Sequence, residues 1–282
     1  MNLSKWWVAG VLLVAGVSAY IGNAVWQQHK SQQGLVLTEC QIEEVVPTYI
    51  HFFVTNDVLQ VMTKEQVKQR IEKIIQSANT VLKNSCIPLQ RQIKSIQYVD
   101  FSEQYLFDFG SVHFALQKAV GTQVIGRIRQ TMNEFYAILL GPDNTIFDDQ
   151  WRGTSEMSPE GRFIAMSYDA MPLTFEHEMG HLAGADHDQQ TIDEQAAFGF
   201  EQIVPLWDQK QSKPYARAAL CGDAGTVMSY NHNILPVYSH PGLYYQGEQC
   251  GDPEHADNAR VLRRYAKHLK QELIAGHWIA DR

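Results

Sequence analysis

The chain has 282 residues, of which 45% are hydrophobic and 19% charged, proportions typical of a folded globular protein rather than a disordered one. Its 31 acidic side chains outnumber its 23 basic ones, giving a formal net charge of −8. Because nucleic-acid binding depends on clustered positive charge and the chain has no basic run, nucleic acid is excluded as an expected partner.

The first 30 residues predict export from the cytoplasm. A short start with one lysine, residues 1–5, precedes residues 6–26, which contain no charged side chain. A helix of that length spans about 30 Å, enough to cross a bilayer. The segment fits a signal anchor that stays in the membrane, and it equally fits a signal peptide cleaved before Tyr20. Residues 31–47 are then a short linker or pro-segment, and residues 48–282 form one domain.

Export also determines the interpretation of the four cysteines. Either form of export places the rest of the chain outside the cytoplasm, in the periplasm or secreted, where paired cysteines form disulfides. Four cysteines allow three pairings, and sequential pairing is the simplest because each bridge then encloses one local unit. We therefore expect Cys40–Cys86 and Cys221–Cys250.

Hydrophobic periodicity predicts alternating strands and helices. We expect strands at 49–54, 93–99, 136–140 and 162–168, a helix that starts at the capping box formed by Thr63 and Gln66 and runs to Asn84, a helical stretch between 112 and 132, and a C-terminal helix over 257–274. No linker rich in Pro, Ser or Gly separates these elements, which indicates a single domain.

Residues 141–161 are expected to form a polar loop. The loop contains Asp143, Asn144, Asp148 and Asp149, whose oxygens are of the type that calcium prefers. A solvated surface loop explains the same composition, so the sequence leaves both interpretations open.

The residues suited to chemistry are concentrated in the segment 177–187, HEMGHLAGADH. His177 and His181 are four residues apart, so on a helix their side chains lie about 40° apart around the axis and both rings can reach one metal ion. Gly184 can adopt the left-handed conformation that ends a helix and reverses the chain, which lets His187 return as a third ligand. Three neutral imidazoles predict a catalytic zinc site with one open position.

Glu178 follows the first of these histidines and is expected to serve the reaction rather than bind the metal. Zinc lowers the pKa of a bound water to about 7, Glu178 accepts the proton, and the hydroxide attacks a carbonyl polarised by the metal. Glu178 then returns the proton to the leaving amine. The motif therefore predicts zinc-dependent hydrolysis of an amide bond.

The pattern HExxHxxGxxH resembles that of the metzincin clan of zinc endopeptidases. Residues 226–230, TVMSY, are similar to the Met-turn of that clan, and the resemblance implies that Met228 forms an apolar floor beneath the zinc. Asp188 after the third histidine is similar to the adamalysin (reprolysin) branch. Tyr230 is instead similar to astacins and serralysins, where a tyrosine approaches the metal. Tyr230 is accordingly expected either to be catalytic or to pack beside the site.

The resemblance implies a zincin-like α+β fold, with a twisted mixed sheet, an antiparallel edge strand, an active-site helix and a C-terminal helix. The strand at 162–168 is the expected edge strand, where an extended peptide substrate would pair. Residues 234–238, ILPVY, either line the pocket for the substrate residue after the scissile bond or pack as an apolar loop. Asp188 either orients a zinc ligand or caps a helix.

The sequence thus predicts an exported zinc metalloendopeptidase whose partner is a protein or peptide substrate. The substrate remains open: the enzyme could cut proteins broadly, process one partner protein or cleave the peptide bridges of the cell wall. Two other functions also remain open. One is an exported zinc-containing binding or adhesion module without catalysis, which would be expected to lack Glu178, and the other is a zinc hydrolase of a non-peptide amide.

Overall fold

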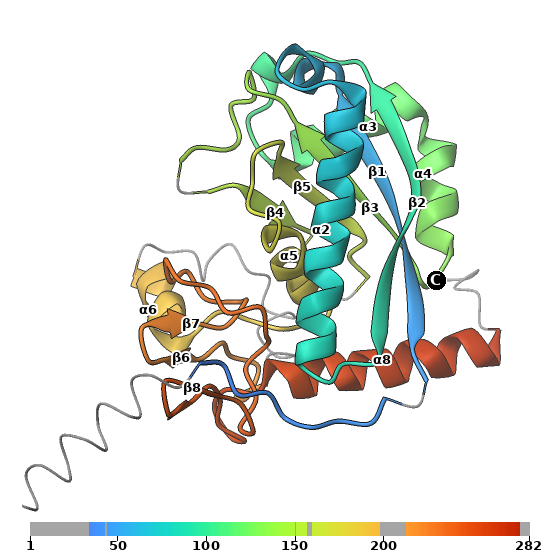
Figure 1. The fold of residues 1–282 in the computed structure, drawn as a ribbon. Helices are drawn as coiled ribbons and strands as arrows, with labels where there is room; N and C mark the ends of the chain where they lie inside the picture. The colour runs from blue at the N-terminus through green and yellow to red at the C-terminus, as the bar shows by residue number, and fades with distance from the viewer. Residues whose placement is uncertain (1–33, 43, 150, 157–159, 198–212, 277–282) are drawn as a thin grey trace, which may run out of the picture.

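A computed structural model describes residues 34–42, 44–149, 151–156, 160–197 and 213–276 (Figure 1). The expected export segment at 6–26 lies outside the described residues. Within them, no helix is both long and apolar enough to cross a membrane. The fold is α+β, with a mixed five-stranded sheet at its centre.

The sheet consists of β1 (Val46–Thr55), β2 (Leu89–Val99), β3 (Glu134–Leu140), β4 (Gly153–Ser155) and β5 (Phe163–Ser167), in the order β2-β1-β3-β5-β4. Neighbouring strands are parallel except β4, which runs antiparallel to β5 at one edge. The four predicted strands are therefore confirmed, and β1 begins a few residues earlier than expected.

The predicted position of the edge strand is wrong. β5, within the range expected at the edge, lies between β3 and β4, and all five of its residues are buried. Its unbroken apolar run is typical of a strand covered on both faces. The antiparallel edge is instead β4, which falls inside the stretch expected to be a loop. Its sequence, Gly-Thr-Ser, is too short and too polar to show a strand pattern.

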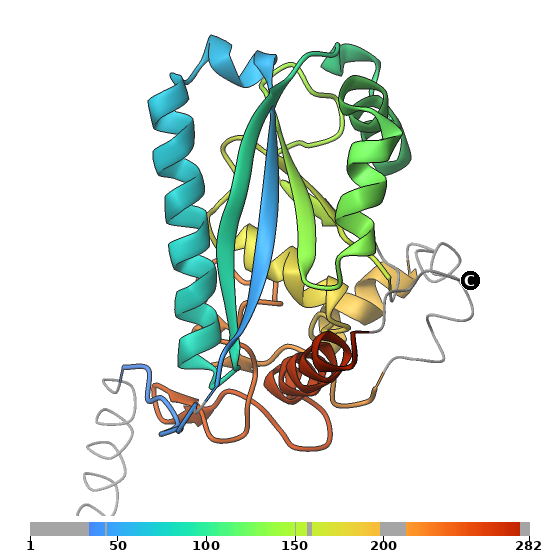
Figure 2. The same ribbon diagram turned by 90° about the vertical axis from the view of Figure 1, so that its right-hand side faces the viewer.

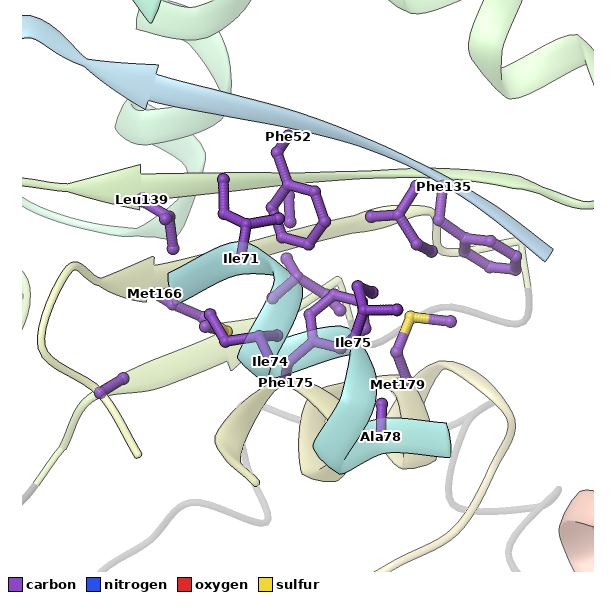
Figure 3. Packing of buried hydrophobic residues seen from close by; sticks show 14 of the residues in the cluster. Phe52, Ile71, Ile74, Ile75, Ala78, Phe135, Leu139, Met166, Phe175 and Met179 are labelled. Carbon is purple, nitrogen blue, oxygen red and sulfur yellow. The ribbon is translucent and has the colours of Figure 1, made fainter. Parts of the chain in front are cut away.

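One face of the sheet is covered by two helices. α2 (Lys64–Asn84) starts at the predicted capping box, where Thr63 accepts a hydrogen bond from the Gln66 amide and the Gln66 side chain accepts one from Thr63. α5 (Thr174–Leu182) packs beside it. Figure 3 shows apolar side chains of both helices meeting those of the strands, among them Phe52, Ile71, Ile74, Phe135, Phe175 and Met179.

The opposite face is covered by α3 (Phe109–Val120) and α4 (Thr122–Gln130), and Figure 2 shows these helices and α2 on opposite sides of the sheet. They occupy the predicted helical stretch. Gly121 lies between them with a φ of 91°, a left-handed conformation that favours glycine, so the stretch is divided into two helices. Short 3-10 turns, η1 (Asn56–Gln60) and η2 (Glu103–Tyr105), follow β1 and β2.

After α5 come α6 (Gln189–Ala197), the hairpins β6–β7 (Leu220–Cys221, Ala224–Gly225) and β8–β9 (Tyr244–Tyr245, Glu248–Gln249), and α8 (Asn258–Ala275). α8, the predicted C-terminal helix, passes beneath one end of the sheet (Figure 1) and packs with the last turns of α2. Both predicted disulfides, Cys40–Cys86 and Cys221–Cys250, are present. The second closes the region that follows α6.

Candidate metal centre

α5 is buried on almost all sides. Phe175 and Met179 face the core of the sheet layer, whereas His177 and His181 lie on the other side of the helix. There His177 faces Val227, in the chain that follows α6, and His181 faces Ala185, just after α5. A buried ion pair between Arg91 of β2 and Glu176 joins the helix to the sheet, with two parallel hydrogen bonds of 3.0 Å.

The end of α5 brings the third histidine back to the first two. Gly184 has a φ of 88°. Its amide donates to the carbonyl of His181 and the amide of Ala185 donates to that of Gly180, both at 2.9 Å, which together form a Schellman motif. The chain reverses there, as the glycine predicted, and His187 comes to lie against both histidines of the helix.

The three imidazoles converge through their Nε2 atoms. Nε2 of His187 lies 3.2 Å from that of His177 and 3.0 Å from that of His181. Zinc–nitrogen bonds of about 2.0–2.1 Å in a tetrahedral site place ligand nitrogens about 3.3 Å apart, so these separations suit zinc. Among the described residues, this is the one group of three or more His, Cys, Asp or Glu side chains close enough to hold a metal ion.

The outer nitrogen of each ring faces an oxygen. Nδ1 of His177 lies 2.9 Å from the carbonyl oxygen of Val227, Nδ1 of His181 lies 3.1 Å from that of Ala185, and Nδ1 of His187 lies 3.3 Å from Oε1 of Gln195. An oxygen acceptor requires the proton on Nδ1, which leaves the Nε2 lone pair free to point into the cluster.

Electrostatics agree with neutral rings. Burial, together with repulsion between neighbouring imidazolium charges, lowers the pKa of each of the three histidines to about 3. The rings are therefore uncharged at neutral pH and do not have to lose a proton before they bind a cation. The donor set consequently fits zinc in number, spacing and charge.

Glu178 is only 5% exposed and lies against β4. Ser155 donates a 2.8 Å hydrogen bond to its Oε2 atom. Burial raises the pKa of Glu178 to about 7, and the bond from Ser155 opposes part of this rise. No sequence motif pointed to Ser155, because 23 residues separate it from Glu178.

The predicted Met-turn supports the helix from beneath. Met228 is fully buried, and its sulfur lies so near Gly180 that a Cβ atom at that position would be 2.5 Å from it. The turn is closed by a 2.8 Å hydrogen bond from the Ser229 amide to the Thr226 carbonyl. Because Val227 accepts the hydrogen bond from His177, the same turn holds both the helix and one ring.

Tyr230 lies at the open side of the histidine cluster and is 54% exposed. Its ring is nearly parallel to that of His177, at 12° and 5.6 Å between centroids, and 4.5 Å from that of His187. The phenol therefore adjoins two of the three rings.

Asp188, which follows the third histidine, has a structural role. Asp188 caps α6, since its carboxylate accepts hydrogen bonds from the amide and the hydroxyl of Thr191 at 3.0 and 2.8 Å. Of the two interpretations of Asp188, these contacts support the helix cap, and Gln195, two turns along α6, is the residue whose Oε1 faces Nδ1 of His187.

Residues 234–238 pack rather than line a pocket. Leu235 and Val237 are buried in a cluster around the Cys221–Cys250 disulfide. The Tyr238 hydroxyl donates to the carbonyl oxygen of Glu176 at 2.8 Å and contacts its carboxylate at 3.0 Å. Of the two interpretations of this segment, the structure supports the apolar loop.

Polar side chains of the loop after β3 form hydrogen bonds and an ion pair within the loop. Asn144 accepts from the Phe147 amide and Asp148 accepts from the Trp151 amide, at 2.9 and 2.8 Å, while Asp149 pairs with Arg152. These contacts favour the interpretation as a surface loop over that as a calcium site.

No protein-family model matches the chain, and no curated protein is significantly similar to it. The chain is similar in fold to a solved structure described as a chaperone–substrate complex, with a TM-score of 0.58 and 14% identity over 81% of this chain and 35% of that chain. It thus spans about a third of that protein's length. Metalloproteinase-II from Bacteroides fragilis matches with a TM-score of 0.34 and 18% identity over 57% of this chain and 50% of that one.

Proposed function

We propose that this protein is an extracytoplasmic zinc-dependent endopeptidase of the metzincin type, with a zincin-like fold. The observation that carries the proposal is the convergence of three Nε2 atoms, each on a ring whose Nδ1 faces an oxygen, next to the helix α5, which bears two of these rings and the buried Glu178. His177, His181 and His187 would hold the ion. Zinc bound there supplies Lewis acidity for a water molecule and for the substrate carbonyl.

The chain's own residues supply the remaining chemistry. Glu178 accepts a proton from the attacking water and later donates it to the leaving amine, a role suited to a buried carboxyl held in one orientation. Tyr230, beside the rings of His177 and His187, donates a hydrogen bond to the oxyanion that develops on the substrate. Met228 keeps α5 in place from beneath.

The position of β4 favours a peptide as the substrate. β4 is an edge strand, so one row of its backbone groups has no partner strand in the sheet and can pair with an extended chain. Its Ser155 contacts Glu178, which places that edge beside the proposed base. The two disulfides favour an oxidising compartment outside the cytoplasm.

The proposal is tested by incubating the purified protein with a diverse peptide library, with and without a zinc chelator. We expect cleavage that the chelator abolishes and added zinc restores. Glu178→Ala should keep one zinc ion per chain and lose at least about a thousandfold in kcat/KM, because it removes the base and not a ligand. His187→Ala should instead weaken zinc binding.

Each alternative function gives a different result in this experiment. Zinc binding without cleavage of any peptide supports a binding module, and cleavage confined to small non-peptide amides supports an amide hydrolase. Full peptidase activity in Glu178→Ala contradicts the proposed mechanism.

A further inference from the structure

We infer that Ser155 is a positioning residue that holds Glu178 in its working orientation. The inference rests on the proposed function. Ser155 is almost completely buried, and its hydroxyl donates the 2.8 Å hydrogen bond to Oε2 of Glu178. A hydroxyl has one proton to donate, and among the described residues no other hydrogen-bond donor to this carboxylate is found.

The second oxygen of Glu178, Oε1, is confined by close packing against Gly153 of β4. Gly153, two residues before Ser155, faces the same side of the strand. A Cβ atom on Gly153 would lie 2.6 Å from Cγ2 of Thr174 and 3.1 Å from Oε1 of Glu178. The strand thus lies tightly against the carboxylate at Oε1 and binds it at Oε2. Rotation of the carboxyl group is restricted on both sides.

β4 is short, yet it is anchored at both ends. Before it, Arg152 pairs with Asp169 at 3.0 Å and with Asp149 at 2.9 Å. After it, Glu156 forms two hydrogen bonds, of 2.7 and 3.0 Å, with Arg129 of α4. The three residues between these ion pairs also pair with β5.

Such anchoring gives Ser155 the fixed position that orientation of a catalytic group requires. With Oε2 held by Ser155, Oε1 is left to exchange the proton with water and with the leaving amine. Because the rate of proton transfer depends steeply on geometry, a base that is free to turn is less effective even though it is still present.

The test compares Ser155→Ala with its parent. A hydrogen bond to a charged group corresponds to about a tenfold to hundredfold change in an equilibrium. We expect kcat to fall by about that factor, KM to change little and zinc content to stay at one per chain. Ser155→Thr restores the hydroxyl and should recover most of kcat. Ser95→Ala, which removes a strand hydroxyl bonded to His51 at 2.9 Å, is the matched control and should leave kcat unchanged.

A double-mutant cycle separates positioning from a general structural effect. In a Glu178→Ala background, Ser155→Ala should cause no further loss of the residual rate, because the group it positions is gone. An equal fractional loss in both backgrounds, or a Ser155→Ala variant as fast as the parent, overturns the inference.

A second cycle needs no activity. Urea unfolding of the metal-free protein should show that the changes caused by Ser155→Ala and Glu178→Ala are not additive, because the two side chains contact each other. Additive changes overturn the inference. If the parent cleaves no peptide, the proposed function fails by itself, and this unfolding cycle still decides whether Ser155 holds Glu178.

Discussion

At the scale of single residues, the oxygens behind the three histidines come from three different places in the fold. His177 is supported by the turn at residues 226–229, His181 by the end of its own helix, and His187 by α6. Each support fixes which nitrogen carries the proton and how the ring is turned. A ligand set of this kind is preorganised, so binding a cation requires little rearrangement of the rings.

Tyr230 belongs to this scale as well, because its proposed role depends on one hydroxyl. In Tyr230→Phe the ring can still stack on His177, so folding and zinc content should be retained. A donor that acts mainly in the transition state should be lost from kcat, by about a hundredfold, with little change in KM. Steady-state kinetics on a cleaved peptide measure both constants.

The control for this variant is Tyr105→Phe, at a highly exposed position on η2. It should leave both constants unchanged. A Tyr230→Phe enzyme as fast as its parent would mean that this tyrosine only packs beside the site.

At the scale of elements, the ends of β1 and β3 surround a buried carboxylate, that of Glu103, which lies outside the metal centre. Glu103 of η2 accepts hydrogen bonds from the Thr55 hydroxyl, at the end of β1, and from the Gly141 amide after β3, the latter at 2.7 Å. Both bonds use Oε1, and no hydrogen-bond partner for its buried Oε2 is found among the described residues. Burial raises the pKa of Glu103, with smaller contributions from the charges of Asp57 and Asp143.

This carboxyl predicts a pH-dependent stability. A raised pKa means that the folded protein binds the proton more tightly than the unfolded chain. Glu103 therefore destabilises the fold increasingly as pH rises from its ordinary value of 4.5 through its raised pKa. Glu103→Gln removes the charge, so it should stabilise the protein at pH 8 and lose that advantage towards pH 5.

Urea unfolding at the two pH values measures the difference between Glu103→Gln and its parent. Taking this difference cancels the titration of the three histidines, which lowers the stability of both proteins as pH falls below about 6.5. Glu65→Gln, at an exposed position of α2, is the control. A constant advantage of Glu103→Gln across the range would contradict the prediction.

At the scale of the whole molecule, the chain before β1 and the chain after α6 are tied together. Val36 forms a bridge with Tyr244, and Cys40 is joined to Cys86 at the end of α2. The Cys221–Cys250 disulfide closes the region that contains Met228 and Val227. Two covalent bridges therefore secure two different parts: one the segment before the sheet, the other the support beneath the metal centre.

Removal of either disulfide should lower stability, but removal of only one of them should also lower activity. The bridges span 46 and 29 sequence positions, and loops of this size correspond to about 3–4 kcal/mol in the chain-entropy model. Replacing either cysteine pair by serine should lower the free energy of unfolding by a similar amount. Only loss of Cys221–Cys250 should also reduce kcat, because it loosens the turn at residues 226–229 beneath the three histidines.

Urea unfolding measures the loss of stability in each variant. Steady-state kinetics, at a temperature where both variants remain folded, measure kcat, and the variant without Cys40–Cys86 is the matched control. Equal losses of kcat in the two variants would show that the effect is one of general stability.

The parts of the fold that were predictable from the sequence are those determined by local geometry. The capping box at Thr63 starts α2, continuous apolar runs form the buried strands, and Gly184 reverses the chain after α5. The four-residue spacing of His177 and His181 places both rings on one side of a helix, whatever surrounds it. The sequential disulfides follow from the small number of pairings that four cysteines allow.

Tertiary structure decided the features that join distant segments. β4 is too short and polar for a periodic pattern, so its pairing with β5 and its position at the edge arise only when the sheet assembles. Ser155, Arg91 and Gln195 carry no motif, and their roles come from contacts with α5 and His187. Spacing along the chain can place ligands on one helix, but the groups that orient them lie far away in sequence, where only packing determines which side chain arrives.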